Sequence, residues 1–233
     1  MEKINKRKLK NIPTLQKLYD NWEKWGQDYE IFLDNNSPKK QKGIKKIGQD
    51  FSWRENIYDE LRTQIQIYDG ANHRDDHCCF CDGYPIGENS KETIEHFHPK
   101  ADYPLQAYDW NNLFYCCDKC QSEANKIPFT YTLKPSDSDY MFDSYFYFDL
   151  GSGKVKVLEN LEKDSPDEYK KGEDFLKRYG INNDKRSKAR KYLFEDVKNF
   201  LQKQSNSEDS RIRHDFKYRF VYDFAKKLIH STN

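Results

Sequence analysis

Two Cys-x-x-Cys pairs constrain this chain more than any other feature of its sequence. The first pair is Cys78 and Cys81, and the second is Cys117 and Cys120. Two short turns that each present two thiolates have the spacing of a tetrahedral four-cysteine zinc site. One ion bound by both pairs would tie the intervening segment at both ends. We therefore expect the chemistry of this protein to lie within residues 78–126.

Three further residues near these pairs leave alternatives open. Cys79 and Cys116 each stand directly beside a proposed ligand, and we expect both to be small, partly buried fillers. Ligation by Cys79 together with Cys81, or by Cys116 together with Cys120, is an alternative. His77 is a further substitute ligand.

The distribution of the cysteines favours metal binding in a reducing compartment. All six cysteines lie between positions 78 and 120, whereas a disulfide framework usually spreads its cysteines along the chain. The basic N-terminus is not followed by the apolar run that a secretory signal requires. No continuous apolar stretch reaches the roughly 18 residues of a transmembrane helix. We therefore expect a soluble, cytoplasmic protein whose cysteines bind metal.

Size and charge set only broad limits. The 233 residues suit one domain of ordinary size, or a small core with appendages, and the formal net charge is +1. Residues 71–130 carry 5 basic and 10 acidic side chains, whereas residues 1–70 carry 14 and 11, and residues 131–233 carry 21 and 18. Attraction of a polyanion to the acidic centre would therefore depend on bound cations and on the basic flanks.

Helical patterns precede the centre. From Pro13 to about residue 32, apolar and aromatic residues recur at helical spacing and predict a helix with an aromatic packing face, which Gly26 weakens or interrupts. A second amphipathic helix is predicted over residues 53–68. Between the two, residues 35–48 contain five lysines and no acid, which predicts either a solvated loop or an arm that contacts phosphates.

A hairpin and further helices are predicted after the centre. The β-prone runs 142–150 and 154–158 flank Gly-Ser-Gly, which predicts a β-hairpin. Helical patterns then cover residues 169–179, 185–201 and 211–229. The second of these carries a basic cluster, which predicts either a solvated helix face or a surface for nucleic acid or a partner; its members are Lys185, Arg186, Lys188, Arg190 and Lys191.

The segment between the cysteine pairs carries the candidate reactive groups. Four thiolates leave zinc no open coordination position, so zinc there should stabilise the shape only. Glu95 and His96 would point to opposite sides of a strand, but at a strand end before Pro99 both can line one cleft. A carboxylate binds a hard divalent ion, and a neutral imidazole can take a proton from water.

These motifs resemble those of the HNH endonuclease family, which has the ββα-metal fold. In that family a zinc-binding pair precedes an acidic residue and a histidine, Asn-Leu begins a strand, and a second C-x-x-C opens a helix. The matching strings here are E-H-F-H-P-K, Y-D-W-N-N-L and C-D-K-C. More narrowly, these strings resemble the HNH subunits of Septu anti-phage defence systems and related retron-associated nucleases.

The resemblance implies a role for each matching residue. His96 is the general base that activates water, Glu95 is a ligand of a catalytic Mg²⁺ or Mn²⁺, and Asn112 orients the loop that carries His96. Gln121 stands where the family places Asn or His as the second metal ligand, which is a departure. Asn125 lies four residues further, on the same face of a helix, and is the alternative ligand.

Substrate contacts and a partner are also implied. His98, Lys100 and Lys126 are candidates for contacting nucleic acid, although His98 can be purely structural and Lys126 a solvated helix residue. The resemblance implies products with 5′-phosphate and 3′-hydroxyl ends. It also implies an ABC-type ATPase as the partner subunit of a defence complex.

The expected fold class is α+β, with a zinc-clamped ββα-metal HNH core embedded in a mainly helical chain and an additional β-hairpin. The expected regions are residues 1–70 (helical, with a basic leader and a lysine-rich loop), 71–135 (nuclease core with the four-cysteine zinc site) and 136–233 (hairpin and C-terminal helices). Two other classes of function compete with the nuclease. One is a catalytically silent zinc module that binds nucleic acid or a partner, and the other is a redox thiol protein.

Overall fold

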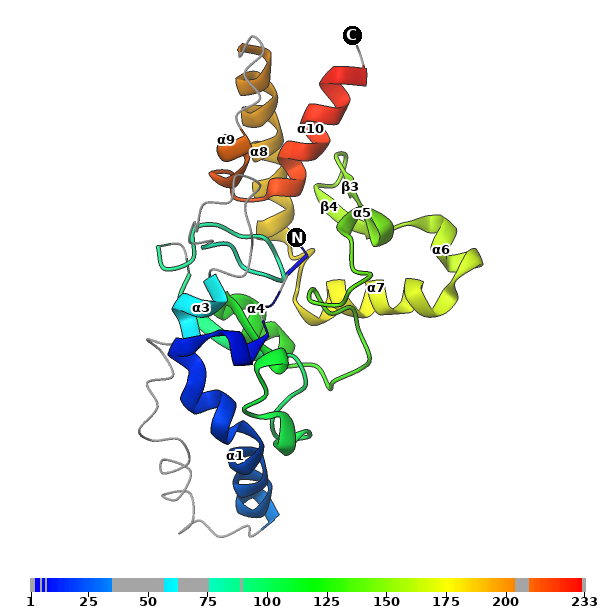
Figure 1. Cartoon of the computed structure of the whole chain (residues 1–233). Helices are drawn as coiled ribbons and strands as arrows, with labels where there is room; N and C mark the ends of the chain where they lie inside the picture. The colour runs from blue at the N-terminus through cyan, green and yellow to red at the C-terminus, as the bar shows by residue number, and fades with distance from the viewer. Residues whose placement is uncertain are drawn as a thin grey trace. The chain divides into compact units, whose positions relative to one another are not determined.

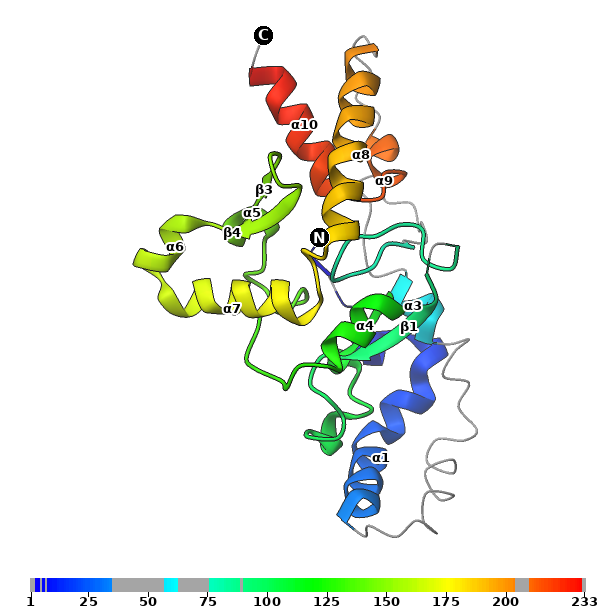
Figure 2. The same ribbon diagram turned by 180° about the vertical axis from the view of Figure 1, so that it is seen from behind.

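Helices and short strands make up the computed structural model of the chain (Figures 1 and 2). It describes residues 3–4, 6, 8–34, 57–62, 76–88, 90–203 and 210–231. The chain divides into two compact units. The cysteine unit comprises Met1–Lys3, Asp76–Glu92 and Cys116–Asn233, and the histidine unit comprises Ile4–Asp75 and Thr93–Tyr115. Residues 71–135 thus contribute to both units, and their assignment to one nuclease core stays a prediction.

An aromatic helix forms much of the histidine unit. The 3₁₀ turn η2 (Pro13–Leu15) leads into α1 (Gln16–Asp34), and proline suits this start because it lacks the amide hydrogen that a first turn leaves unpaired. Trp25 and Tyr29 of α1 are buried, and their ring centroids lie 5.7 and 6.3 Å from that of Tyr108. The predicted packing role of this aromatic face is confirmed.

Helix α1 runs through Gly26, so of the two predicted effects the interruption is wrong, and the weakening of the helix stays a prediction. A β-carbon at position 26 would lie 2.5 Å from the carbonyl oxygen of Leu105, in the 3₁₀ turn η5 (Pro104–Gln106). Glycine is needed here because two backbones approach each other closely.

Only a part of the second predicted helix is described. It is α3 (Tyr58–Arg62), which is helical as expected and carries the buried Leu61. The remainder of the predicted helix over residues 53–68, and the lysine-rich segment 35–48, lie outside the described residues.

The centre of the chain follows the order strand, strand, helix. Strand β1 (Glu92–His96) pairs with β2 (Leu113–Cys117) in a two-stranded antiparallel sheet, and α4 (Asp118–Ala124) follows β2 directly. The 3₁₀ turn η6 (Trp110–Asn112) brings the chain into β2, where every residue is buried. The strand end at His96, the strand start at Leu113 and the helix start within the second cysteine pair are therefore present as predicted.

The predicted hairpin is confirmed in the cysteine unit. Strands β3 (Phe146–Asp149) and β4 (Lys154–Val157) pair antiparallel, with Phe146 opposite Val157. The predicted first strand is wrong over residues 142–145, which form the short helix α5 (Phe142–Tyr145). There the ring of Phe142 stacks on that of Phe220, at a centroid distance of 5.1 Å.

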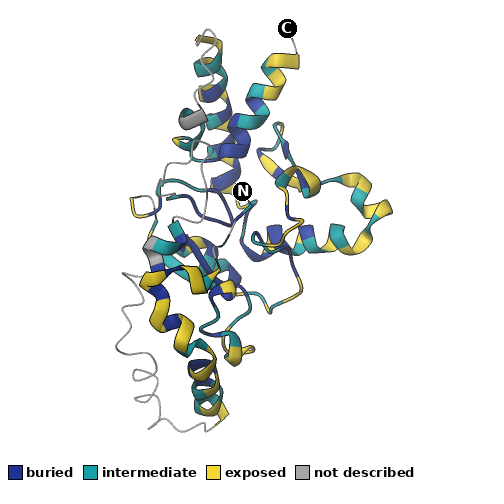
Figure 3. Cartoon of the chain, in the orientation of Figure 1, coloured by how far each residue is buried: buried dark blue, intermediate teal, exposed yellow. Residues whose placement is uncertain are grey.

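Helices complete the cysteine unit: α6 (Glu159–Asp164), α7 (Pro166–Arg178), α8 (Asp184–Lys203), α9 (Ser210–His214) and α10 (Arg219–Ser231). Helices α8 and α10 lie side by side (Figures 1 and 2). Burial of α10 is concentrated in its first two turns and fades toward its C-terminal end (Figure 3). No helix within the described ranges is long and apolar enough to cross a membrane.

The single helix predicted over residues 211–229 is wrong, because the chain breaks between α9 and α10. The break coincides with a buried ion pair. The backbone N–H of Arg219, the first residue of α10, donates to Oδ2 of Asp82 over 2.6 Å, and its Nε donates to Oδ1 over 2.8 Å. Asp82 lies in the turn after the first cysteine pair at a φ of 57°, so one residue shapes the turn and anchors a distant helix.

The Asp82–Arg219 pair is fully buried and has a third member. Nδ1 of His77 lies 3.2 Å from Oδ1 of Asp82, and all three side chains are at most 1% exposed. Burial alone would raise the pKa of the Asp82 carboxyl, but the charges of Arg219 and His77 hold that pKa well below its usual range. A carboxylate with such partners is stable in the interior only while they are present.

The predicted basic cluster on α8 is not one surface. Arg186 and Arg190 are 7% and 0% exposed, and the Nη1 atom of Arg190 donates to the carbonyl oxygen of Gly153 over 3.0 Å. Gly153, in the β3–β4 turn, has a φ of +70° and leaves room for α8, since a β-carbon there would lie 2.3 Å from the carbonyl oxygen of Ser187. Only the three lysines of the cluster are exposed: Lys185, Lys188 and Lys191.

Replacing Arg219 should destabilise the protein strongly. Arg219→Leu would leave the Asp82 carboxylate buried without its main counter-charge, and we expect the free energy of unfolding to fall by about 3–5 kcal/mol. Arg213→Leu is the matched control, because its pair with Asp223 (2.6 Å) is partly exposed and should contribute less than about 1 kcal/mol. Denaturant unfolding measures both, and equal losses would contradict the buried ion pair.

Candidate metal centre and candidate active site

The four predicted cysteines come together in the cysteine unit. The Sγ atoms of Cys78, Cys81, Cys117 and Cys120 all lie within 4.8 Å of one another, and all four residues are buried. The Sγ atoms are 3.7 Å apart for Cys78 and Cys120, and 3.9 Å apart for Cys81 and Cys117. Tetrahedral zinc with Zn–S bonds of about 2.3 Å separates its sulfurs by about 3.8 Å. We call these four residues the sulfur cluster; they form a possible metal site that is compatible with zinc.

Backbone geometry presents the sulfurs to one another. The first pair lies in a tight turn in which the N–H of Asp82 donates to the carbonyl oxygen of Cys78 over 2.8 Å, and the N–H of Cys78 donates to that of Gly83 over 2.9 Å. The second pair straddles the start of α4, where the N–H of Cys120 donates to Sγ of Cys117 over 3.4 Å. The N–H of Cys117 donates to Sγ of Cys78 over 3.4 Å. Such N–H···S bonds favour the thiolate forms that zinc requires.

Arg186 of α8, which the sequence analysis placed in a basic cluster on a helix face, instead contacts the sulfur cluster. Its Nη2 lies 3.3 Å from Sγ of Cys120 and 3.7 Å from Sγ of Cys117. Its Nη1 donates to the carbonyl oxygens of Tyr179 and Gly180, over 2.7 and 2.9 Å. Burial alone would lower the pKa of Arg186, but the negative charge of the cluster sulfurs raises it. Four thiolates around a Zn²⁺ ion would carry a net charge of −2, and Arg186 would offset part of it.

The alternative ligands are outside the sulfur cluster. Cys79 and Cys116 are buried, as expected of fillers, and none of the six cysteines forms a disulfide. Both ring nitrogens of His77 contact other groups, since Nδ1 faces Asp82 and Nε2 lies 2.9 Å from the carbonyl oxygen of His214. The cluster therefore contains the four residues of the two Cys-x-x-Cys pairs and not these alternatives.

In the histidine unit, His96 is the last residue of β1 and is half-buried. Its Nε2 lies 2.9 Å from the carbonyl oxygen of Ala107. A carbonyl oxygen only accepts hydrogen bonds, so Nε2 carries the hydrogen and Nδ1 of the neutral ring keeps its lone pair. Burial and the nearby charge of Lys100 lower the pKa of His96 to about 4. The ring is therefore neutral at pH 7 and able to accept a proton at Nδ1.

Asn112 fixes the loop that follows His96. It is 1% exposed, and its amide nitrogen donates to the carbonyl oxygens of His98 (2.9 Å) and Gln106 (3.0 Å). Its Oδ1 accepts from the backbone N–H of His98 over 2.7 Å. Three hydrogen bonds thus connect one side chain to both ends of the loop between β1 and η6. These hydrogen bonds are compatible with the predicted role of Asn112 in orienting the loop, and its role in catalysis stays a prediction.

The predicted ligands of a catalytic ion are divided between the two units. Glu95 is 4% exposed and belongs to the histidine unit. Gln121 is half-buried on α4, and Asn125 is exposed just after it, both in the cysteine unit. The N–H of Asn125 donates to the carbonyl oxygen of Gln121 over 3.0 Å. The assignment of these three residues to one Mg²⁺ or Mn²⁺ ion stays a prediction.

The predicted nucleic-acid contacts have different surroundings. Lys100 is exposed, and its Nζ lies 5.9 Å from the centroid of the Tyr29 ring. Lys126 is also exposed and forms an ion pair with Glu123 at 2.7 Å. His98 is half-buried. Its ring centroid lies 5.0 Å from that of Tyr103, so packing accounts for part of its role. Contacts of these residues with nucleic acid stay predictions.

Comparisons with known proteins add no family assignment. No model of a known protein family matches the chain, and no curated protein matches it. The resemblance to HNH endonucleases therefore rests on the motif residues.

Cysteine variants test the sulfur cluster, because Cys78 and Cys117 each have a buried cysteine neighbour that can serve as a control. We expect the purified chain to hold one zinc ion, and Cys78→Ala or Cys117→Ala to lose it together with the fold around the two turns. Cys79→Ala and Cys116→Ala should retain it. Elemental analysis of the purified variants measures the zinc. Equal zinc content in all four variants would contradict the assignment.

Proposed function

We propose that the chain is a metal-dependent endonuclease of the HNH type that hydrolyses phosphodiester bonds in nucleic acid. The observation that carries the proposal is the state of His96. Its Nε2–H is bound to the Ala107 carbonyl oxygen, and its Nδ1 is left with a lone pair on a neutral ring at a strand end. A neutral ring with an available lone pair can act as a general base, and a pKa of about 4 makes it a weak base in the free protein.

The proposed step begins with water beside Nδ1 of His96. The ring takes a proton from that water as the water oxygen attacks the phosphorus. The bond from phosphorus to the 3′ oxygen breaks, and the 3′ oxygen takes a proton from solvent. The hydrogen bond to Ala107 stabilises the imidazolium that forms. The pairing of Asn112 with the following loop supports a fixed ring position, since that loop contains Ala107's neighbour Gln106. General-base catalysis of this kind typically contributes about 10²–10⁴-fold to the rate.

A divalent ion completes the proposal. Glu95 would hold it, together with Gln121 or Asn125, and carboxylate and amide oxygens suit Mg²⁺ or Mn²⁺. Such an ion would stabilise negative charge on the leaving oxygen. Zinc in the sulfur cluster would have no open position and would act on the structure alone.

The biological setting follows from the resemblance. We place the chain as the nuclease subunit of an anti-phage defence complex, with an ABC-type ATPase as its partner. Co-purification with an ATPase encoded beside it, followed by cleavage assays on plasmid, phage DNA and RNA, tests both the partner and the substrate.

A catalytically silent zinc module is the second candidate. Gln121 favours it, because a longer amide stands where HNH enzymes carry Asn or His. Such a module would bind nucleic acid or a partner without cleaving.

Replacing His96 separates the two candidates. We expect His96→Ala to lower the cleavage rate by about 10²–10⁴-fold with Mg²⁺ or Mn²⁺ while zinc content and unfolding temperature stay close to those of wild type. His230→Ala, at an exposed position of α10, is the control and should cleave as wild type does. Equal activity of wild type and His96→Ala, or no cleavage by either, would reject the nuclease.

The adjacent asparagines offer a second test. Asn112→Asp would place a carboxylate oxygen against the carbonyl oxygens of His98 and Gln106, and we expect a loss of roughly 1–3 kcal/mol for each unsatisfied carbonyl, with reduced cleavage. Asn111→Asp makes the same chemical change at an exposed neighbour. Thermal unfolding and cleavage are measured on both. If the Asn112→Asp protein is as stable and as active as the Asn111→Asp protein, Asn112 does not position the loop after His96.

A further inference from the structure

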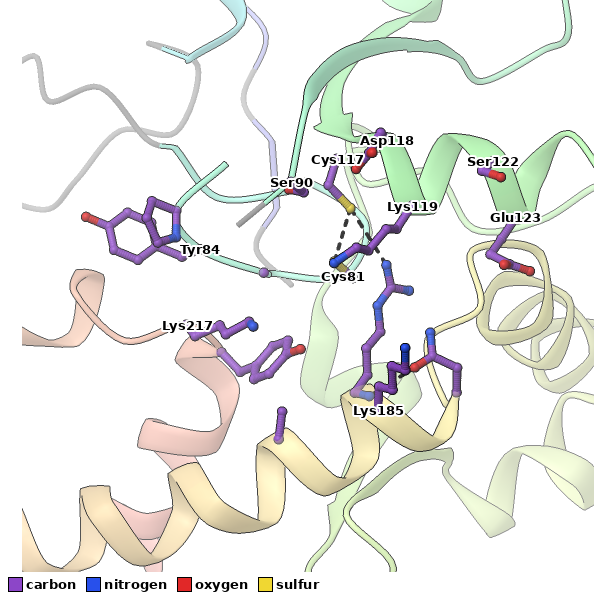
Figure 4. Close-up of a pocket in the computed structure, with 16 residues that line it drawn as sticks. Cys81, Tyr84, Ser90, Cys117, Asp118, Lys119, Ser122, Glu123, Lys185 and Lys217 are labelled. Atoms are coloured by element: carbon purple, nitrogen blue, oxygen red, sulfur yellow. Dashed lines mark hydrogen bonds between the residues drawn. The ribbon is translucent and has the colours of Figure 1, made fainter. Parts of the chain in front are cut away.

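A cavity of about 460 Å³ opens beside the sulfur cluster. Its wall is formed by the first cysteine turn, the starts of α4 and α8, and the residues just before α10 (Figure 4). All of these belong to the cysteine unit. The volume lies within the roughly 300–1,000 Å³ of small-molecule sites. The cavity is large enough for one nucleotide unit.

Three lysines from three separate segments line this cavity. They are Lys119 on α4, Lys185 on the first turn of α8, and Lys217 just before α10. Their ammonium ends face the cavity from different sides (Figure 4). Three segments distant in the sequence thus each contribute one positive charge to this cavity; Lys119 and Lys185 are exposed and Lys217 is half-buried.

These charges are only partly neutralised within the cysteine unit. In the part of the chain that the structure describes, neither Lys185 nor Lys217 forms an ion pair with a carboxylate, and Lys217 is half-buried. The lining contains the carboxylates of Asp118 and Glu123, and Glu123 is paired with Lys126 at 2.7 Å. The lining thus carries three lysines against two carboxylates, and the sulfurs of Cys81 and Cys117 add negative charge that Arg186 partly offsets.

Arg186 also lines the cavity, but its guanidinium interacts with the sulfur cluster and not with the open part of the cavity. Its guanidinium is turned to the sulfurs of Cys117 and Cys120 and to two carbonyl oxygens. An anionic ligand in the cavity would therefore interact with the three lysines and not with Arg186. The 20-residue helix α8 adds partial positive charge at its N-terminal end, where Asn183 and Lys185 line the wall.

The remaining lining suits a nucleotide. Ser90 and Ser122 supply hydroxyl groups that can donate to phosphate oxygens. Tyr84 lines one end of the cavity, and its half-buried ring is stacked on His77 at a centroid distance of 4.5 Å. An aromatic ring held in this way offers a surface for a base.

We propose that this cavity binds the phosphate group of a nucleotide, either free or within a nucleic-acid strand. Lys119, Lys185 and Lys217 contact the phosphate oxygens, and Tyr84 contacts the base. The site is separate from His96 and does not depend on cleavage. It gives the otherwise acidic centre of the chain a place that attracts a polyanion.

Binding by full-length chain carrying His96→Ala tests the proposal without degradation of the ligand. The triple variant Lys119→Ala, Lys185→Ala, Lys217→Ala is compared with a control triple at exposed lysines outside the cavity, Lys154→Ala, Lys163→Ala, Lys177→Ala. The probes are labelled single-stranded DNA and RNA, ATP, AMP and inorganic phosphate. Zinc content and unfolding temperature check that both triples are folded.

We expect the cavity triple to bind the preferred probe about 10- to 100-fold more weakly than the control triple at 0.1 M salt. For a strand, the slope of log K against log salt should fall by about 2, since each lost contact to a single strand contributes about 0.7. Binding of strands alone identifies a strand site, and binding of ATP or AMP alone identifies a site for free nucleotides. Either result supports the proposal.

Equal binding by the two triples for every probe would overturn the proposal, and so would the absence of binding of any probe to the parent chain. These outcomes are independent of the nuclease activity. A wild-type chain that never cleaves, with a cavity triple that loses binding, would reject the proposed function and retain this site. A wild-type chain that cleaves nucleic acid, together with equal binding by both triple variants, would support the proposed function and reject this binding site.

Discussion

The cysteine unit depends on the close approach of four cysteine sulfurs, which holds its separate segments together. The sulfurs come from a turn after residue 76 and from the junction of β2 and α4, and they bring together segments more than 30 residues apart in the sequence. Closing such a loop costs conformational entropy, and the free energy of binding a metal ion there would offset that cost. The two ends of the segment that carries Glu95 and His96 are fixed by this convergence.

Buried charges around the cluster connect it to the C-terminal helices. Arg186 joins α8 to the sulfurs, and Asp82, which shapes the first cysteine turn, holds the first residue of α10. Each charge is satisfied by several partners, which is the condition under which the interior tolerates it. The helices therefore do more than cover the cluster, because they supply the positive charge that a four-thiolate site attracts.

The sequence predicted features that depend on local chemistry. The two Cys-x-x-Cys pairs, the Gly-Ser-Gly hairpin and the aromatic face of α1 follow from spacing and turn preferences, and each is present. Features that depend on distant contacts were not visible. The continuity of α1 at Gly26 requires knowledge of Leu105, and the break before α10 requires knowledge of Asp82.

The burial of Arg186 and Arg190 shows that the charge of a residue alone does not predict its exposure. Both were counted with a surface cluster, because arginine is usually exposed. A signal was nevertheless present, since Arg186, Arg190, Phe194 and Val197 follow one helical face at spacings of four, four and three. At the candidate active site, the motif indicated His96 as the base. The hydrogen on its Nε2 could not be predicted, because it depends on the carbonyl of Ala107.

X-ray absorption at the zinc edge of the purified full-length protein tests the central claim most directly. The account predicts four sulfur ligands at about 2.3 Å and no nitrogen or oxygen ligand. A coordination shell with fewer sulfurs, or with nitrogen or oxygen in place of sulfur, would contradict it.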